Sequence, residues 1–495
     1  MPAALTAWAV TAAGIAWRAG PVLAVVCSAV GIGWWMLQRR CGTRRPVLRA
    51  ATAGVIGAAV IGTGFGAAVS LRSDAVEQHR LTRSFGDSAA VTVIATEGPR
   101  AAGTARVVFH ADLAALDGEP AAGRVVVFAS AFDVPAVSAG RPVRLRARIS
   151  RPTRRDLTVA VLTAAGRLTL GRASGVQQVA DTVRRRFSVV AREALPPAQA
   201  AMLPGLVLGD TSAVAPATAA EFRTAGLTHL TAVSGANVTI VCAAVLLGAA
   251  VVGPRAAVLL AGLALAGFVV LVGPGASVLR AAVMAAITLL AMLSARRRQA
   301  IPALSAAVIA LMLLAPHLAV DVGFALSVSA TAALAVLAPA WSRRLVERGW
   351  PKPPADAVCV AVAAQLVTAP LIAAISGRFS VVSVLANLLV VVVIPPITVL
   401  GTAAAALCPM LPWVAGLLIR FTGPELWWLL TVAHRAAGLP GAAVPVPSGW
   451  PGLLTVGGAA LAAAVLWRRR WFRICAAGVG IAALAWSLSG VVGGA

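Results

Sequence analysis

Polar side chains interrupt the apolar stretch at residues 227–239, and their types could do chemistry. The stretch contains His229, Ser234, Gly235 and Asn237. If it is helical, His229 and Asn237 lie eight residues apart and share roughly one face. A serine near a histidine suits nucleophilic catalysis, although no acidic residue is at hand to orient the imidazole. The alternatives are helix–helix hydrogen bonds and a helix break at Ser234-Gly235 that exposes backbone carbonyls to a cavity.

Other polar residues lie singly within later apolar segments, where they are costly and by default mark a pathway or a buried partner. Arg280, about one turn into a segment, either extends its head group to the membrane interface or lines a path for an anionic substrate. Asp321 begins a segment, so it could cap that helix or pair with Arg280. The candidate path residues are His229, Ser234, Gly235, Asn237, Arg280, Asp321, Ser327, Gln365 and Asn387.

The spacing of potential metal ligands argues against a metal or cofactor site. The five histidines occur singly, and none of the six cysteines forms a CxxC pair. Zinc sites in local sequence usually show such paired spacings. No GxxxxGK[ST] loop occurs either, so the chain is expected to bind no cofactor and to draw its energy from a partner ATPase or a proton gradient.

A basic segment of a different character lies at residues 72–197. It holds 19 arginines and 11 acidic residues, a net charge of +8. Alternating or β-branched stretches predict strands at 90–95, 105–110, 124–129, 143–149, 157–162 and 167–170, and these predict a small barrel of OB-like type. Aromatic residues are few, so a base-stacking surface is weakly signalled, and a solvated structural domain is the alternative. The candidate DNA-binding residues are Arg141, Arg144, Arg146, Arg148, Arg154 and Arg155.

The rest of the chain has the composition of a multi-pass membrane protein. Of its 495 residues 59% are hydrophobic and only 12% are charged, with a net charge of +25. Uncharged runs of about 20 residues predict about 12–13 spans. The pair Pro395-Pro396 interrupts one of them, and Gly423-Pro424 indicates either a broken or re-entrant helix or an interfacial loop. Arginine-rich short loops fall on one side at every step, which places them in the cytoplasm and the β domain outside the cell. The predicted domains are residues 1–71, 72–197 and 198–495.

Several motifs in the carboxyl-terminal part occur together and in order. They resemble the central membrane domain of the ComEC competence family over roughly residues 191–465. The motifs that carry the resemblance are Gly205-Leu-Val-Leu-Gly209-Asp210, Phe222-Arg-Thr-Ala-Gly226-Leu-Thr-His229, Ser234-Gly235, Arg280-Ala-Ala, Asp321-Val-Gly323-Phe324-Ala-Leu-Ser327, Gln365-Leu-Val-Thr368-Ala-Pro370 and Asn387-Leu-Leu.

The resemblance implies a channel in the plasma membrane that admits single-stranded DNA during natural transformation. It also implies a DNA receptor, a cytoplasmic helicase or ATPase and contact with membrane lipid, and it leaves a homodimer open. Many members continue into a metallo-β-lactamase-like nuclease domain; no His-x-His-x-Asp-His pattern occurs before Ala495, so we expect no nuclease activity and a separate nuclease as a partner. Rival hypotheses are a membrane-embedded transferase or hydrolase using His229 and Ser234, a small-molecule transporter, and a scaffold.

Overall fold

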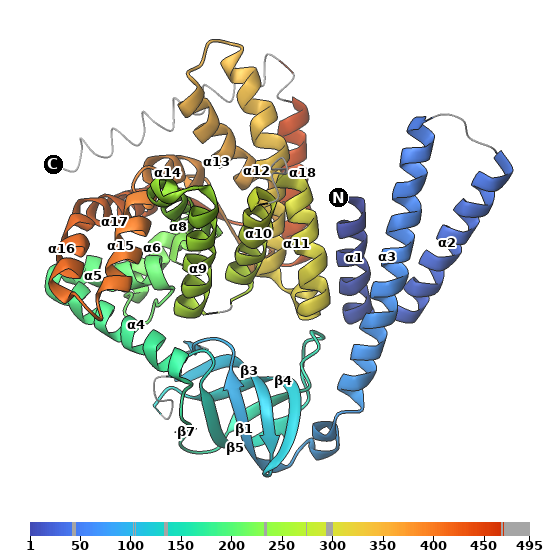
Figure 1. The fold of residues 1–495 in the computed structure, drawn as a ribbon, viewed down its shortest axis with the longest axis horizontal. Coiled ribbons are helices and arrows are strands. Elements are labelled where there is room, and N and C mark those ends of the chain that lie inside the picture. Colours follow the sequence, from blue (N-terminus) through green and yellow to red (C-terminus); the bar gives the residue numbers. More distant parts are fainter. Residues whose placement is uncertain are drawn as a thin grey trace. The chain divides into compact units, whose positions relative to one another are not determined.

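The protein is mainly helical, with a β-barrel inserted after the first three helices (Figure 1). The computed structural model describes residues 1–41, 46–101, 103, 105–132, 137–231, 235–273, 275–293, 300–466 and 469. It confirms the predicted fold class, a polytopic helical membrane protein carrying a small inserted barrel. The chain forms two compact units, Met1–Arg186 with Ser234–Ala325, and Phe187–Val233 with Leu326–Ala495.

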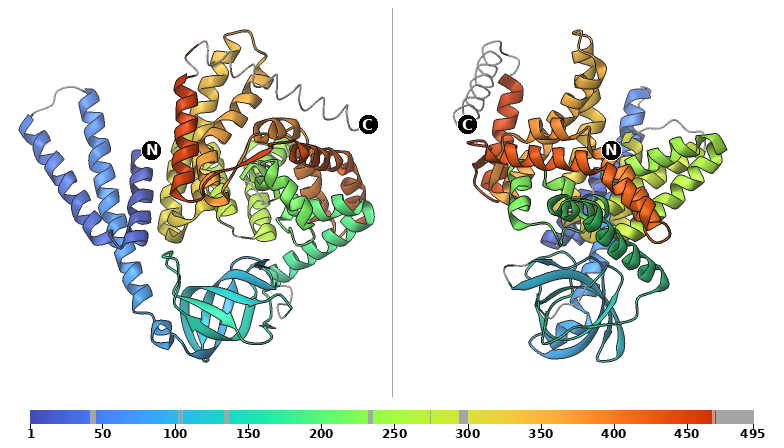
Figure 2. Two further views of the ribbon diagram at one scale, coloured as in Figure 1. Left: turned by 180° about the vertical axis from the view of Figure 1, so that it is seen from behind. Right: turned by 90° about the vertical axis from the view of Figure 1, so that its left-hand side faces the viewer.

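The first unit begins with three apolar helices: α1 (Pro2–Trp17), α2 (Gly20–Cys41) and α3 (Pro46–Glu77). Arg18 ends α1 in the left-handed conformation and turns the chain back at once. Small residues then allow close approach, because a Cβ on Gly66 would lie 2.9 Å from the backbone nitrogen of Ala24 in α2. Figure 2 shows α1, α2 and α3 as neighbours. Such glycine contacts are the usual way in which membrane helices associate.

The barrel follows a short 3-10 turn, η1 (Arg80–Ser84), and its residues alternate between core and solvent. Its strands are β1 (Ser88–Ala95), β2 (Arg100–Ala101), β3 (Arg106–Leu116), β4 (Glu119–Ser130), β5 (Pro142–Ser150), β6 (Ala160–Ala164) and β7 (Thr169–Leu170). Five of them close in the order β1-β3-β4-β6-β5 and back to β1, with β2 and β7 as short additions. Only the β4–β6 pair among these five is parallel.

Closure of the barrel gives every core strand two neighbours, so no long edge is left unpaired. Phe109, Ile149 and Leu162 are fully buried inside it. The β3–β4 hairpin turns at Asp117 and Gly118, which both have positive φ. This is the requirement of a type I′ turn, whose twist matches that of the flanking strands.

The same unit contains further helices after the barrel: α4 (Gly175–Ala194, which continues into the second unit), α8 (Gly235–Gly248), η2 (Ala249–Val252), α9 (Pro254–Val272), α10 (Ala276–Leu293), α11 (Ala300–Leu314) and η3 (Pro316–Val320). Helix α10 packs against α8, α9 and α11.

Three arginines bind carbonyl groups at the carboxyl ends of helices α1, α9 and α11. Arg155, from the β5–β6 loop, donates to Ala16 O of α1 at 3.3 Å. Arg184 of α4 donates to Leu271 O of α9 at 2.7 Å, and Arg72 of α3 donates to Leu313 O of α11 at 2.7 Å. The last carbonyls of a helix have no partner within it and carry partial negative charge. These three helices therefore end on the barrel side of the unit.

The second unit is helical apart from one small sheet. Its elements are α5 (Pro197–Leu208), α6 (Pro216–Thr224), α7 (Thr228–Thr231), α12 (Val322–Val346, which begins in the first unit), α13 (Lys352–Ser376), β8 (Arg378–Ser380), α14 (Ser383–Val390), α15 (Ile394–Leu407), α16 (Pro412–Phe421), α17 (Gly423–Gly438), β9 (Ala443–Pro445) and α18 (Trp450–Leu466).

Two helices of this unit are broken at the positions that the proline residues of the sequence indicate. Helices α14 and α15 meet at an angle of 55°, just before Pro395-Pro396, and α16 gives way to α17 at Gly423-Pro424. A proline lacks the N–H group that would continue the helix ladder. Both interruptions are therefore confirmed.

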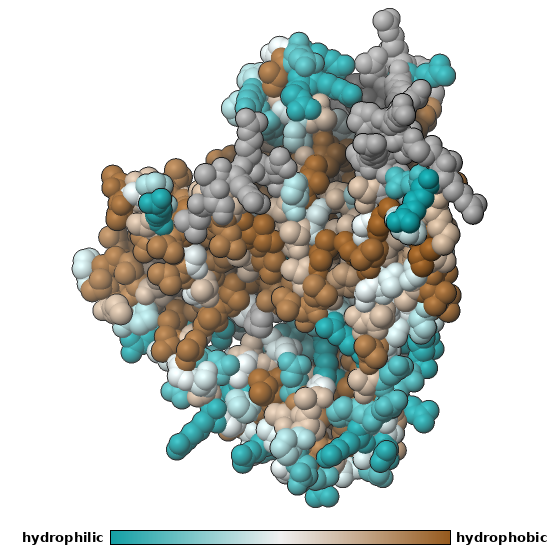
Figure 3. Space-filling model, turned by 45° about the vertical axis from the view of Figure 1, so that its right-hand side comes forward, coloured by the Kyte–Doolittle hydropathy of each residue, from teal (hydrophilic) through white to brown (hydrophobic). Residues whose placement is uncertain are grey.

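The helices carry the apolar surface of a membrane protein. Six of the described helices are long and apolar enough to cross a membrane, or seven if α14 and α15 count as one bent span. Six further apolar helices are shorter, so the count of about 12–13 spans stays a prediction. Val22, Val25 and Val30 of α2 are more than half exposed. Figure 3 shows apolar residues gathered over the helices and hydrophilic residues over the barrel.

Candidate functional site

A row of three arginines runs along the outside of strand β5. Arg144, Arg146 and Arg148 are exposed, while the residues between them, such as Leu145 and Ala147, are buried. Because side chains alternate along a strand, the three guanidinium groups share one face, with successive Cα atoms about 6.8 Å apart. The sequence predicted all three as DNA-binding, and the fold places them side by side.

The neighbouring strands present small side chains to this row. On β1, Thr92, Ala90 and Ser88 are the register partners of Arg144, Arg146 and Arg148 respectively. On the other side, Thr163 of β6 pairs with Arg148 and Thr169 of β7 pairs with Arg144. The nearby carboxylate of Asp117 accepts a hydrogen bond from the backbone N–H of Ala90 at 2.9 Å. Because the neighbouring side chains on β1, β6 and β7 are small, the arginine row is accessible to an external anion.

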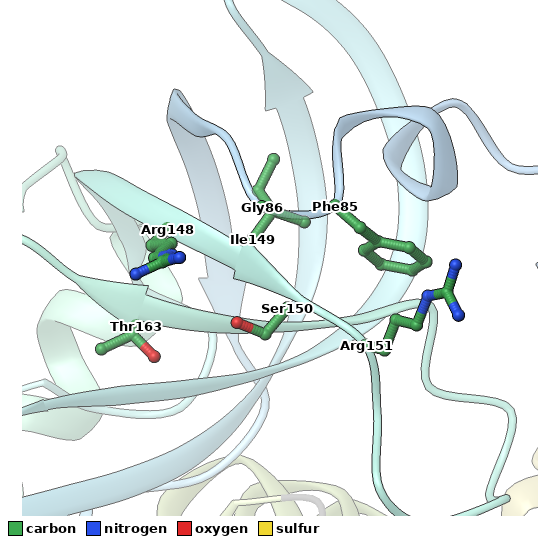
Figure 4. Close-up of a pocket in the computed structure, with 7 residues that line it drawn as sticks. All are labelled: Phe85, Gly86, Arg148, Ile149, Ser150, Arg151 and Thr163. Carbon is green, nitrogen blue, oxygen red and sulfur yellow. The ribbon is translucent and has the colours of Figure 1, made fainter.

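An open pocket of about 550 Å³ lies at the Arg148 end of the row. Its walls are Phe85, Gly86, Arg148, Ile149, Ser150, Arg151 and Thr163. In Figure 4, Phe85 and Arg151 form one side of the pocket, and Arg148 and Thr163 lie on the other. The Arg151 guanidinium is 5.6 Å from the centre of the Phe85 ring, within cation–π range. Two cations, an aromatic face and two hydroxyl groups suit the phosphate and base of one nucleotide.

The other predicted DNA-binding arginines lie outside the row. Arg141 is half-buried just before β5, and its Nε is buried with no hydrogen-bond partner in the described structure. Arg154 and Arg155 are exposed in the β5–β6 loop. Since Arg155 binds the end of α1, its position suits anchoring of the barrel more than recognition of an external strand.

The candidate path residues are divided between the two units. Gly235, Asn237, Arg280 and Asp321 belong to the first unit, whereas His229, Ser327, Gln365 and Asn387 belong to the second. Ser234 lies outside the described residues.

Arg280 and Gly235 come together in the first unit. Arg280 is only 2% exposed, and a Cβ built on Gly235 would be 3.5 Å from its Nη2 atom. Asn237, in the first turn of α8, is also buried. Gly235 and Arg280 are 45 residues apart in the sequence, and the packing of α8 on α10 brings them together.

Asp321 caps helix α12, which is one of the two roles predicted for it. Its Oδ1 accepts a hydrogen bond from the N–H of Phe324 at 2.7 Å. Its charge also acts on Arg124 of β4, whose pKa is lowered by burial and raised in turn by Asp156, Asp112, Glu97 and Asp321. Asp321 is thus part of a charged cluster beside the barrel.

His317, in η3, belongs to the same cluster. Burial and the nearby Arg124 lower the pKa of His317 to about 4, against a smaller opposing effect of Asp156 and a small further lowering by His110. The imidazole is therefore neutral at physiological pH. His110 itself lies against Glu97, 2.5 Å from its Oε1 to Nδ1.

In the second unit, Gln365 and Asn387 meet through a buried serine. Ser383 donates from Oγ to Gln365 Oε1 at 3.0 Å, and Asn387 Nδ2 donates to the Ser383 carbonyl at 2.8 Å. Gly226 packs on this serine, since a Cβ there would lie 2.4 Å from Ser383 Oγ. His229 is exposed on α7, and Ser327 is half-buried on α12.

Sequence reasoning did not single out Ser383, or the contact of Phe85 with Arg151. A serine in an apolar stretch gives no signal of its own, and Arg151 follows the end of the alternating pattern. Among the described residues no group of three His, Cys, Asp or Glu side chains could hold a metal ion.

Comparisons with known proteins agree with the membrane character of the chain. A family model described as Competence protein matches residues 206–471, more than half of the chain. The chain is 27% identical over 213 residues to ComE operon protein 3 of Bacillus subtilis (strain 168). That match covers 42% of this chain but only 26% of the relative, so the chain spans about a quarter of that protein. No solved structure matches the chain.

Acidification should destabilise the protein through His317. The unfolded histidine binds its proton near pH 6.5 and the folded one near pH 4, so the unfolded state holds more protons between these values. Stability is therefore full above pH 6.5 and falls by at most about 3 kcal/mol towards pH 4. Thermal unfolding of purified protein against pH should show that His317→Gln has a flatter profile and that His434→Gln, at an exposed position, does not. Equal profiles for wild type and His317→Gln would contradict this expectation.

Gly226→Ala should disrupt the Gln365–Ser383–Asn387 contacts. The glycine has φ of +72°, and the added methyl group would collide with Ser383. We expect a loss of about 1–3 kcal/mol, measured as a lower thermal midpoint. Gly262→Ala is the control, because that position in α9 has open space around it and should be neutral or slightly stabilising. A Gly226→Ala protein as stable as the Gly262→Ala protein would refute this account.

Proposed function

The chain belongs to the Competence protein family, and from this premise we propose that it admits single-stranded DNA through the cytoplasmic membrane during natural transformation. The multi-pass helical part would supply the path, and the barrel, on the outer side, would receive the strand. The observation that carries the proposal is the exposed Arg144–Arg146–Arg148 row with the pocket at its end.

The row has the chemistry that a single strand requires. Guanidinium groups neutralise phosphates and release their counterions, which gives affinity without sequence preference. Phe85 offers a face on which a base could stack, and Arg148 and Arg151 flank it. A nonspecific contact suits a protein that must accept any incoming sequence.

The strand order of the barrel also supports the proposal. Its five core strands follow the order first, second, third, fifth, fourth, with the third and fifth parallel. A closed barrel of five strands is similar to OB-type barrels, a fold that commonly binds oligonucleotides. In such barrels the second and third strands and adjoining loops are frequent binding surfaces, whereas the arginine row here lies on the fourth.

The proposal leaves several tasks to other proteins. In this scheme a helicase or ATPase on the cytoplasmic side would pull the strand, and a nuclease would degrade its complement. A surface receptor would deliver the DNA, and a homodimer is compatible with this scheme. The path itself would use polar residues of the helical part, with weak contacts that do not trap the strand.

Substitution of the arginine row should weaken DNA binding in a salt-dependent manner. For the full chain in lipid nanodiscs, the triple variant Arg144→Gln, Arg146→Gln, Arg148→Gln should reduce the slope of log affinity against log salt by about 2 for single-stranded DNA. The matched control replaces Arg80, Arg83 and Arg106, exposed arginines of the same region, and should change the slope less. Fluorescence anisotropy with a labelled oligothymidylate measures both.

In cells, the row variant should lower the transformation frequency, whereas the control triple should not. Equal slopes for the two triple variants would refute the role of the row. Normal transformation in a complete deletion would refute the proposed function itself. Ser234→Ala offers a check on the rival enzyme hypothesis, since it would abolish a serine hydrolase but leave most DNA uptake intact.

A further inference from the structure

The turn between helices α12 and α13 carries a cluster of positive charges. Helix α12 ends at Val346 and α13 begins at Lys352, and Figure 1 shows the two helices running side by side to a shared tip. This α12–α13 tip, residues 343–354, has four exposed basic side chains: Arg343, Arg344, Arg348 and Lys352. None of the ion pairs among the described residues includes any of the four. The tip therefore presents its cations to whatever surrounds it.

The backbone of the α12–α13 tip is a closed turn. The N–H of Gly349 donates to Val346 O at 2.9 Å. The N–H of Trp350 donates to Leu345 O at 3.1 Å. Gly349 has φ of +91°, so the two bonds form a Schellman motif that ends α12. Pro351, with its restricted φ, then leads directly into α13. The basic side chains are thus carried by an ordered backbone, which lowers the entropy cost of binding a ligand.

The two helices are also joined beneath the tip. Ser342, at the end of α12, is buried and donates from Oγ to Oδ1 of Asp356 in α13. Ala338 and Cys359 pack in one apolar cluster below this bond. The Asp356 carboxylate is thus bonded inward, and the tip itself contains one acidic residue, Glu347, against four basic ones, a net charge of +3.

The length of α12 puts these cations at the surface of a membrane. Helices α12 and α13 have 25 residues each and are both apolar enough to cross a bilayer. At 1.5 Å per residue, Arg343 lies about 32 Å along the helix from Val322, and a hydrocarbon core is about 30 Å thick. Trp350, in the same tip, is 49% exposed. Tryptophan is enriched at the level of lipid head groups, so the tip has the composition and the depth that a head-group contact requires.

We propose that the α12–α13 tip binds the phosphate head groups of anionic phospholipids in the cytoplasmic leaflet. Basic loops of membrane proteins lie on the cytoplasmic side, and the surface of that leaflet is negatively charged. Guanidinium groups bind phosphate oxygens through paired hydrogen bonds, and the Trp350 ring packs at the interface beside them. Lipid is favoured over an acidic protein because two spans hold the tip at the bilayer surface, where phosphates are always within reach.

This inference goes beyond DNA uptake and does not depend on it. Bound lipid would hold α12 and α13 at a fixed depth in the membrane. Helix α13 carries Gln365, which accepts a hydrogen bond from Ser383. The depth of this polar network in the bilayer would then depend on the lipid contact at the tip.

The experiment titrates the full chain in detergent with phosphatidylglycerol or phosphatidylcholine and measures the bound fraction by native mass spectrometry. The tip variant carries Arg343→Gln, Arg344→Gln, Arg348→Gln and Lys352→Gln. The matched control replaces four exposed arginines that lie apart in the same unit, with Arg223→Gln, Arg378→Gln, Arg420→Gln and Arg435→Gln. Both variants lose four positive charges, so the comparison isolates the place of the charges from their number.

The wild type should bind phosphatidylglycerol more tightly than phosphatidylcholine. A basic side chain near an anionic surface contributes about fivefold in affinity, so the tip variant should lose at least about tenfold for phosphatidylglycerol and the control much less. Glu347→Gln removes the acidic residue of the tip and should strengthen phosphatidylglycerol binding by up to about fivefold. Trp350→Ala should weaken the binding of both lipids alike, because the indole contact does not depend on head-group charge.

Equal losses in the tip variant and the control would overturn the proposal, as would a tip variant that loses affinity equally for both lipids. Oligothymidylate and polyglutamate serve as competitors. If either displaced phosphatidylglycerol from the wild type but not from the control sites alone, the surface would belong to a nucleic acid or an acidic protein, and the assignment to lipid would be wrong. Thermal unfolding without lipid checks the folding of each variant. If the tip variant unfolds, Glu347→Gln decides, since unchanged phosphatidylglycerol affinity in that single variant would also overturn the site.

Discussion

The first unit depends on the way in which the carboxyl ends of its helices are satisfied. A helix that leaves the membrane exposes carbonyl groups that need donors. Arg155, Arg184 and Arg72 supply donors to α1, α9 and α11. A contact of this kind contributes only about 0.3–1 kcal/mol at a surface site, yet together the three tie the barrel and its flanking helices to three helix ends. The positive charge of this region is therefore partly structural.

This use of arginine changes the meaning of the net charge of +25. An arginine that binds a helix end is already occupied, whereas one on an outward strand position with small neighbours is free to meet an anion. Arg155 belongs to the first kind, and Arg144, Arg146 and Arg148 to the second. Net charge alone separates neither class, so the fold must be known before charge is assigned to binding.

The local pattern of the sequence predicted some elements well and others badly, for physical reasons. Strict alternation predicted a strand at 143–149, and β5 spans Pro142–Ser150. The β3–β4 hairpin extends beyond the predicted 105–110 and 124–129, because Asp117-Gly118 forms a tight turn that lets polar residues such as Asp112 stay within strands. Contacts between distant segments gave no local signal, as with Ser383 between Gln365 and Asn387.

The two polar groups in the helical part differ in a way that bears on function. The amide, hydroxyl and carbonyl groups around Ser383 bond to one another, so this network can stabilise the second unit without any ligand. Arg280, in contrast, has a buried donor atom, Nη1, without a hydrogen-bond partner among the described residues. A protein keeps an unsatisfied buried charge at a cost, and selection tolerates such costs mainly at sites that act. Between the two, the incomplete site is therefore the stronger candidate for contact with a transported anion.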